Sequence, residues 1–366
     1  MTDIKIYIPT FTDITEWNKK PYSSTGGTRA KKIYTNEKDI EYFFKGSKKL
    51  GDNTFKYPME FWSEIVSSKT GQWLGFELLD YNIAYDTNDE QKIGCLSKSM
   101  VEYTENKLSE GIEYLRGFDS KYNPNTDENR YTFDFIKQTL YYFNLTKCES
   151  KFIEMLIFDS IIGNSDRHQE NWGFISKFKE TIQEIEKEIE TKKNFISKII
   201  PKFKRLITKD TLSQRIIEEK KNISPKKSTL LNQSLVVQTE FSPIYDSGCC
   251  LGRELEVSRI EKMLKDKQMI QAYINRGRSE VRLKEGAKPR HFDLLNGLKK
   301  DYNSVFNKTI DRVNQLYSLD KLENLINNID KELPSQLFKH KLTDNRKDLM
   351  IKLIDLRIKR LNSLNE

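Results

Sequence analysis

The strongest constraint on the fold is a run of apolar residues at helical spacing that leads directly into a polar segment. Apolar side chains cover almost every side of the helix predicted over Glu149 to Ile162, namely Phe152, Ile153, Met155, Leu156, Phe158, Ile161 and Ile162. A helix of this kind has no polar face to turn toward water, so it must be buried. The segment Gly163 to Gly173 follows at once and is crowded with polar residues: Asn164, Asp166, Arg167, His168, Glu170 and Asn171. The chain therefore brings polar groups to the edge of its core, with an ordinary surface loop as the alternative interpretation.

The composition is that of a folded protein with a very polar surface. Of 366 residues, 37% are hydrophobic and 11% aromatic, which argues against wholesale disorder and predicts one or two domains. No apolar run approaches the roughly 18 residues that a membrane-spanning helix needs, and the N-terminus lacks the pattern of a secretory signal. The four cysteines have neither zinc-site spacing nor the density of a disulfide scaffold. We therefore expect a cytoplasmic protein with reduced thiols and no transmembrane segment.

The positive charge is concentrated in one part of the chain. Residues 176–233 hold fifteen Lys and Arg against eight Asp and Glu, so they carry most of the net charge of +8. We interpret this segment as an insertion that acts as a spacer, recognises substrate or binds an acidic partner. Its most basic part, Lys192 to Lys227, has few aromatic residues to stack on bases, only Phe195 and Phe203, so stable nucleic-acid binding is not expected.

The pattern along the chain predicts an α+β protein. β-Branched and aromatic residues favour strands at 4–8, 32–35, 40–44, 76–85 and 92–96, with one helix at 57–70 between them. After residue 100 the pattern is mostly helical, most clearly at 131–145, 149–162 and 344–364, with a short strand at 234–239. We expect a strand-rich lobe over residues 1–97 and a helical lobe over 98–366 that contains the insertion, with the chemistry between the two lobes.

The polar loop has the residue types that phosphoryl transfer requires. Asp166 and Asn171 lie five residues apart, as do the Asp that orients the attacking hydroxyl and the Asn that holds magnesium in such enzymes. A second carboxylate is needed for the metal, and Asp246 fits because it follows a strand and precedes Gly248. His168 is a second candidate for acid–base chemistry, although Asp166 already fills that role and a histidine here more often supports the loop.

Two segments of the first lobe are candidates for binding the phosphates of a nucleotide. The glycines of Ser23 to Arg29 would let backbone amides approach phosphate oxygens, although the segment is equally consistent with a flexible turn. Lys45 ends an apolar strand and would point its ammonium inward. Glu64 on the following helix is its expected partner, with Glu60 as the alternative one turn earlier.

Taken together, these segments resemble the HipA-like serine/threonine kinases of bacteria, which include toxin-type kinases and proinflammatory kinases of the CtkA type. The likeness is strongest in Asn164 to Asn171, which carries the Asp-x-His-x-x-Asn pattern, and in Pro243 to Asp246. It extends more loosely to Ser24 to Gly27 with Lys31, and to Lys45 and Glu64. It covers residues from about 20 to 255.

The resemblance implies a bilobal kinase fold that uses ATP and Mg²⁺ to phosphorylate Ser or Thr in a protein. By position, Asp166 would be the catalytic base and Lys45 the phosphate-binding lysine, with Asn171 and Asp246 as the magnesium ligands. The ATP-covering loop would comprise Ser24, Gly26, Gly27 and Thr28.

Members of this family also phosphorylate a serine of the phosphate loop, for which Ser24 is the match and Ser23 the close competitor. The resemblance further suggests an antitoxin or a host protein as partner, with delivery to a host by a route that needs no classical signal peptide.

Two other functions fit parts of the sequence. Phosphoinositide kinases also use Asp-Arg-His-x-x-Asn, which Asp166 to Asn171 reproduces, and a basic insertion suits an anionic membrane. The chain lacks the Asp-Phe-Gly that usually follows in those enzymes. A non-enzymatic kinase-like protein that binds nucleic acid through Lys192 to Lys227 is the second alternative.

The adjacent Cys249 and Cys250 are expected to be buried thiols without redox activity.

Overall fold

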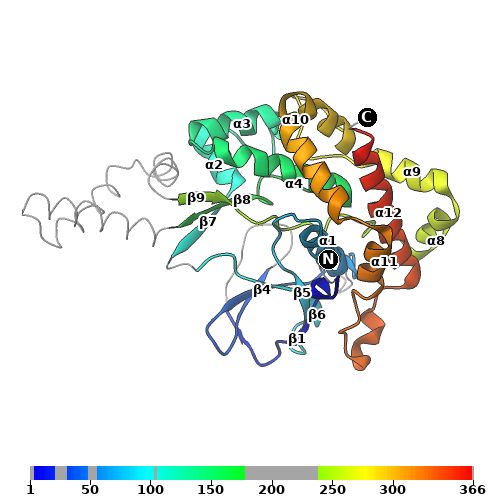
Figure 1. The fold of residues 1–366 in the computed structure, drawn as a ribbon. Coiled ribbons are helices and arrows are strands. Elements are labelled where there is room, and N and C mark those ends of the chain that lie inside the picture. The colour runs from blue at the N-terminus through cyan, green and yellow to red at the C-terminus, as the bar shows by residue number, and fades with distance from the viewer. Residues whose placement is uncertain (1–3, 21–30, 48–55, 103–104, 178–237, 365–366) are drawn as a thin grey trace, which may run out of the picture.

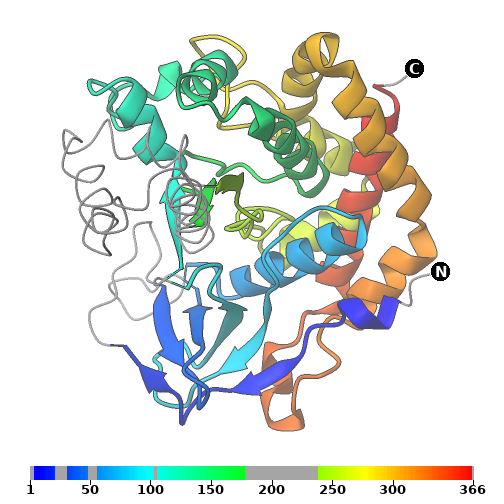
Figure 2. The ribbon, with the colours of Figure 1, turned by 60° about the vertical axis from the view of Figure 1, so that its left-hand side comes forward.

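The computed structural model describes residues 4–20, 31–47, 56–102, 105–177 and 238–364. These residues form two lobes, a strand-rich lobe from the first quarter of the chain and a larger helical lobe from the remainder (Figure 1). Turning the molecule keeps the blue strands at one end and the green and yellow helices at the other (Figure 2). The α+β class expected from the sequence is confirmed.

A six-stranded sheet dominates the first lobe. Its strands are β1 (Phe11–Asp13), β2 (Asn18–Lys19), β3 (Lys32–Thr35), β4 (Glu41–Lys45), β5 (Asn82–Tyr85) and β6 (Ile93–Lys98). Their order is β1-β5-β6-β4-β3-β2, with β1 parallel to β5 and all other pairs antiparallel. In β4, Phe43 pairs with Ser97 and Lys45 with Cys95. Because side chains alternate along a strand, Phe43 and Lys45 project from the same face of the sheet.

The first lobe has one long helix within the described residues, α1 (Glu60–Trp73), which packs against β6 and against the helical lobe. Nearly all of its residues are buried, because it is enclosed on both sides. The sequence offers Gly71 and Gly75 as places where this helix could stop, and the helix continues past Gly71 to Trp73. A Cβ at Gly71 would collide with Leu78 and Phe158, so this glycine allows close packing. The helix ends just before Gly75, which has a left-handed φ of 79°.

The helical lobe is built around α4 (Glu149–Ile162), which packs against α10 (His291–Leu316) and α12 (Asp344–Asn362). The bounds of α4 match the prediction, because a helix that is apolar all round has to occupy the centre. The other helices are α2 (Gly111–Phe118), α3 (Phe133–Tyr142), α8 (Val257–Lys265), α9 (Lys267–Arg276) and α11 (Leu319–Asn327). Among the described residues, no helix is both long and apolar enough to cross a bilayer.

A small antiparallel sheet lies in the second lobe. It consists of β7 (Asn106–Glu110), β8 (Gly173–Lys177) and β9 (Gln238–Phe241), in that order. Lys177 and Gln238 are register partners at the ends of β8 and β9. The two strands would therefore suit a short hairpin connection, which supports treating the intervening residues as an insertion. That basic insertion lies almost entirely outside the described residues.

The sequence prediction was wrong at two places in the first lobe. Residues Ile4–Tyr7 form a 3₁₀ helix, η1, instead of a strand, and η1 packs against α1 and α11. The strand expected from residue 76 begins only at Asn82, because the preceding residues run beside the segment at Ile244 through a single bridge at Leu78.

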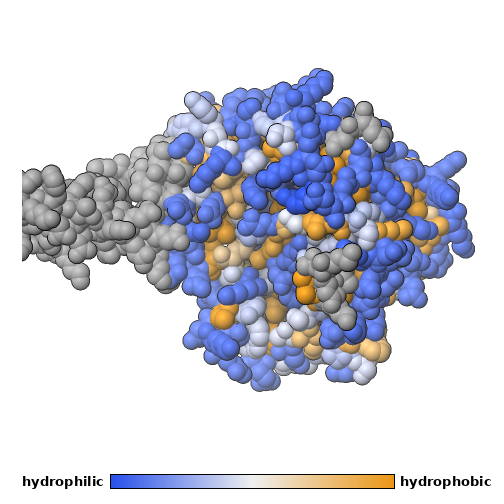
Figure 3. Space-filling model, viewed as in Figure 1, coloured by the Kyte–Doolittle hydropathy of each residue, from blue (hydrophilic) through white to orange (hydrophobic). Residues whose placement is uncertain are grey.

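The visible surface is mostly hydrophilic with scattered apolar spots (Figure 3), as the composition predicts.

Candidate active site

The polar loop leaves α4 through a sharp turn at Gly163. This residue has a left-handed φ of 71°, and a Cβ there would collide with the guanidinium of Arg357. The amides of Gly163 and Asn164 both donate to the carbonyl of Asp159, at 2.8 and 2.9 Å. The end of the central helix therefore fixes where the loop begins, and glycine is required at the turn.

Arg167 is the internal anchor of the loop. Its side chain is about 1% exposed and makes a two-pronged ion pair with Asp159 of α4, at 2.9 and 2.8 Å. Nη1 donates to the carbonyls of Asn171 at 2.6 Å and Tyr245 at 2.5 Å, and Nη2 donates to Ser247 Oγ at 3.0 Å. One guanidinium thus holds the polar loop against the segment that contains Asp246. Burial lowers the pKa of Arg167, but the Asp159 carboxylate outweighs burial and raises it.

Asp166 and Asn171 are oriented by hydrogen bonds within the loop. The Asn171 side-chain amide donates to the Asp166 carbonyl at 2.7 Å, which leaves the carboxamide oxygen of Asn171 without a hydrogen bond from any described residue. The Asp166 carboxylate accepts a hydrogen bond at Oδ2 from the thiol of Cys249, at 3.0 Å. His168 Nδ1 accepts from the amide of Glu170 at 3.3 Å, so this histidine supports the loop.

Asp246 lies across the cleft from the sheet of the first lobe. It has a positive φ of 54°, a strained conformation for a residue with a side chain. Its carboxylate pairs with Lys45 through Oδ1 and lies 3.6 Å from Lys31 Nζ through Oδ2. The next residue, Ser247, donates its amide to Glu64 Oε1 at 2.8 Å. The segment that carries Asp246 is therefore tied to both lobes.

Lys45 is 3% exposed and pairs with Glu64 at 3.1 Å. Of the two glutamates expected as its partner, Glu64 makes this contact, whereas Glu60 pairs with Arg253. Glu64 lies on α1, which packs against β6. Lys45 pairs with both Glu64 and Asp246, so the three residues form one continuous group of charges. The pairing offsets the cost of burying each charge.

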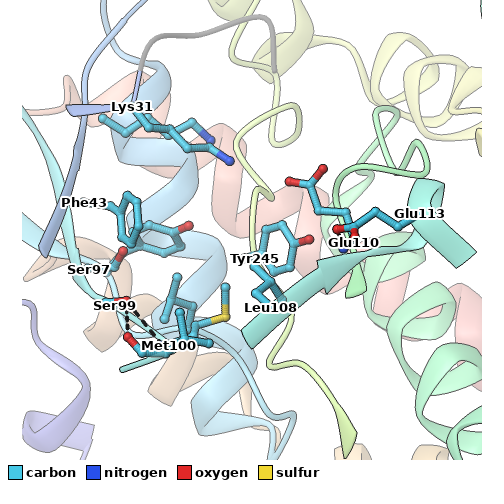
Figure 4. Close-up of a pocket in the computed structure, with 13 residues that line it drawn as sticks. Lys31, Phe43, Ser97, Ser99, Met100, Leu108, Glu110, Glu113 and Tyr245 are labelled. Atoms are coloured by element: carbon cyan, nitrogen blue, oxygen red, sulfur yellow. Dashed lines mark hydrogen bonds between the residues drawn. The ribbon is translucent and has the colours of Figure 1, made fainter. Parts of the chain in front are cut away.

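A cavity of about 290 Å³ lies between the lobes, and Lys45 is one of the residues that line it (Figure 4). Its apolar wall is formed by Phe43, Leu79, Tyr81, Met100, Val101 and Leu108. Lys31 and Lys45 lie on the side of the first lobe, and Glu110 and Glu113 on the opposite side, with Tyr245 between. A flat apolar group and a polyanion can therefore bind at the same time, the first against the apolar wall and the second at the lysines.

Glu110 is the most perturbed carboxylate described at the cavity. Burial, followed by the nearby carboxylates of Glu170, Glu113 and Asp246, raises its pKa to about 7, although Lys31 acts in the opposite direction. No described residue forms an ion pair with it. The charge of Lys31 offsets that of Glu110 only in part.

The site offers oxygen ligands for a divalent cation. The Asp246 carboxylate and the Asn171 carboxamide oxygen are the hard ligands that Mg²⁺ prefers, and Mg²⁺ commonly takes its remaining ligands from phosphates and water. Within the described ranges, no group of three or more His, Cys, Asp or Glu side chains is arranged to hold a metal without such help. The residues present fit a cation that arrives with a phosphate-bearing ligand.

The structure leaves part of the predicted site undescribed and adds residues that the sequence did not reveal. Ser23, Ser24, Gly26, Gly27 and Thr28 lie outside the described residues. Arg167 and Cys249 received no special role from the sequence, because their contacts join segments about 80 positions apart. Lys31 had only its place beside the glycine-rich segment as a signal.

The described residues have a bilobal, kinase-like fold. Among solved structures, the chain is similar to the crystal structure of the Helicobacter pylori proinflammatory kinase CtkA, with a TM-score of 0.64. The likeness covers 97% of this chain and 98% of that chain at 16% sequence identity, so it establishes the fold alone. No protein-family model and no curated protein matches the sequence.

Proposed function

We propose that this protein is an ATP- and Mg²⁺-dependent kinase that transfers the γ-phosphate of ATP to a Ser or Thr hydroxyl of a protein. The observation that carries the proposal is the Arg167 guanidinium, which bonds the carbonyls of Asn171 and Tyr245 from a single nitrogen. This contact joins the loop with Asp166 to the segment with Asp246. Asp246 in turn pairs with Lys45, which lines the cavity.

Each wall of the cavity would bind a different part of the nucleotide. The adenine ring would pack on Phe43, Leu79 and Leu108, where burial of apolar surface favours binding. Lys45, held by Glu64, would then meet the phosphates in place of the Asp246 carboxylate that it now contacts. Lys31, beside the predicted phosphate loop, would supply a second positive charge.

Magnesium would be held by Asp246 and Asn171. When bound, it neutralises charge that develops on the transferred phosphate. The side-chain nitrogen of Asn171 donates a hydrogen bond to the Asp166 carbonyl. This contact fixes the orientation of the carboxamide, so its oxygen is the atom that would bind the metal. Release of Asp246 from Lys45 and Lys31 would accompany binding.

Asp166 would orient the acceptor hydroxyl and accept its proton. Its Oδ2 is occupied by the Cys249 thiol, and no described residue donates to Oδ1. Oδ1 is therefore the atom to which the proton would move. His168 would stay a supporting residue for the loop.

The finer features follow from the resemblance and belong to the same proposal. Ser24, or Ser23 beside it, would be the site of autophosphorylation. A phosphate there adds about −1.5 to −2 charges near the nucleotide phosphates, so it would lower activity. The physiological substrate would be a protein, with an antitoxin or a host protein as a candidate partner.

The test is transfer of label from [γ-³²P]ATP to a generic basic protein or to phosphoinositide vesicles, with and without Mg²⁺. We expect Mg²⁺-dependent label on protein, and at least about a thousandfold loss for Asp166→Asn. Asp134→Asn, on the exposed side of α3, is the matched control and should keep full activity. Label that appears on the lipid only would replace the proposal with the lipid-kinase alternative, and undiminished transfer by Asp166→Asn would refute the assigned base.

A further inference from the structure

We propose that Cys249 is a positioning residue for Asp166: its thiol holds one oxygen of the carboxylate so that the other faces the acceptor hydroxyl. This inference rests on the proposed kinase function and adds a residue to its machinery. The two side chains come from segments separated by 83 positions, and Sγ lies 3.0 Å from Asp166 Oδ2.

The backbone of Asp166 is fixed, but its carboxylate needs a separate restraint. The Asp166 amide donates to Asn164 Oδ1 at 3.3 Å, and its carbonyl accepts from Asn171 at 2.7 Å. Neither contact limits rotation of the side chain. Among the described residues, the Cys249 thiol is the donor that bonds the carboxylate. A group that accepts a proton in the transition state has to be held within a fraction of an ångström, because misplacement costs rate.

The chemistry of the thiol suits this task. Cys249 is 7% exposed and Asp166 is partly buried, so their contact is partly shielded from water. A hydrogen bond to a charged acceptor is stronger than one between neutral groups. A thiol has one hydrogen to donate, and Asp166 Oδ2 at 3.0 Å is a nearer acceptor for it than Glu60 Oε1 at 3.9 Å. A thiol also cannot carry the positive charge that a lysine would add. Oδ1 stays available to the substrate.

The main chain at Cys249 is held independently of its side chain. The Cys249 carbonyl accepts from the Ser165 amide at 3.3 Å, and the Leu251 amide donates to the Ile162 carbonyl at 3.3 Å. These bonds join the segment to the start of the polar loop. Replacing the thiol should therefore remove the contact with Asp166 and leave the two segments aligned.

The neighbouring Cys250 shows that proximity in sequence does not assign this role. Its thiol lies 3.0 Å from Ser67 Oγ of α1 and 2.9 Å from the Ser247 carbonyl. Burial raises the pKa of Cys250 well above its ordinary value, so this thiol stays neutral in the core. Of the two adjacent cysteines, Cys249 is the one that contacts the proposed base.

The experiment compares the full-length wild type with Cys249→Ala, Cys249→Ser and Asp166→Asn. For Cys249→Ala we expect kcat to fall about tenfold, because one hydrogen bond to the charged carboxylate is lost, with the dissociation constant for Mg²⁺–ATP unchanged. A serine hydroxyl also donates, so Cys249→Ser should stay within about threefold of the wild type. Cys148→Ala, which removes a buried thiol remote from the cleft, should leave kcat unchanged. Thermal melts establish that each variant is folded.

The outcomes separate this inference from the proposed function. Wild-type protein that transfers no phosphate to any acceptor refutes the proposed function, and the inference falls with it. An active wild type with an inactive Asp166→Asn and an unchanged Cys249→Ala refutes the inference alone. Equal losses in Cys249→Ala and Cys249→Ser, or a loss of ATP affinity in either, also refute it, because a hydroxyl donor should rescue a positioning contact.

Discussion

Arg167 and Lys45 are both almost completely buried cations, and each pairs with a carboxylate on a buried helix, yet their surroundings differ. Arg167 is enclosed: Asp159 takes two of its donors, and two carbonyls and a hydroxyl take the others. Lys45 pairs with Glu64 and with Asp246, and it also lines a cavity.

The difference separates a structural ion pair from one that a ligand can enter. A guanidinium presents several donors in a fixed fork, so it can hold many acceptors in one arrangement. An ammonium is a point charge that can exchange a carboxylate for a phosphate. We therefore assign a structural role to Arg167 and a ligand-binding role to Lys45.

The largest expected effect is on stability, from Arg167→Met. Removal of one partner leaves the Asp159 charge buried and uncompensated, so we expect a loss of about 3–5 kcal/mol in the free energy of unfolding. The matched control is Arg130→Met, which breaks the partly exposed pairs with Asp119 and Asp127 and should cost about 1 kcal/mol or less. Urea unfolding measures both. Equal losses of unfolding free energy in the two variants would show that the buried Arg167 stabilises the fold no more than the partly exposed Arg130 does.

The next effect is on nucleotide affinity, from Lys45→Met. Loss of one charge-assisted contact to phosphate should weaken Mg²⁺–ATP binding about tenfold to a hundredfold, measured by calorimetry. Lys69→Met is matched in burial, because the Lys69 side chain is also 4% exposed and pairs with Asp80, but Lys69 does not line the cavity. It should keep wild-type affinity. The same loss in both variants would show that burial of the lysine matters and its place at the cavity does not.

The smallest effect concerns Glu110, a buried charge at the same cavity without an ion-pair partner among the described residues. Its pKa is raised from 4.5 to about 7, so the folded state holds the proton more tightly than the unfolded state between these values. Stability contributed by the protonated form is lost as the pH rises from about 4.5 through 7. Glu110→Gln does not titrate, so from pH 5 to pH 8 it should gain about 1–2 kcal/mol relative to the wild type, allowing for partial solvent exposure. Parallel pH profiles from urea unfolding would contradict this.

The sequence predicted best where burial leaves little choice. The helix from Glu149 to Ile162 is apolar on all sides and ends in a glycine, and strand β3 has flanking breaks, so both were predicted with their observed bounds. Strands β1, β2, β7 and β8 were not predicted, and β1 and β2 have only three and two residues, too few to show an alternating pattern. The 3₁₀ helix at Ile4–Tyr7 was predicted as a strand because β-branched residues alternate there.

The site shows a similar division. Asp166, Asn171 and Asp246 were proposed because phosphoryl transfer requires those side chains at such spacing, and Arg167 ties together the two segments that carry them. Their catalytic roles stay predictions. Arg167 lies between two residues of a familiar pattern, and nothing in the sequence distinguishes an arginine that faces the interior from one that faces substrate. The contact of Cys249 with Asp166 depends on a distance across segments, which no local pattern encodes.

The most direct test of the central claim is a crystal structure with a non-hydrolysable ATP analogue and Mn²⁺, which is located by its anomalous scattering. We predict the metal between the Asp246 carboxylate and the Asn171 carboxamide oxygen, with the phosphates at Lys45 and the base against Phe43. A metal bound elsewhere, or a nucleotide outside the cavity, would contradict the account.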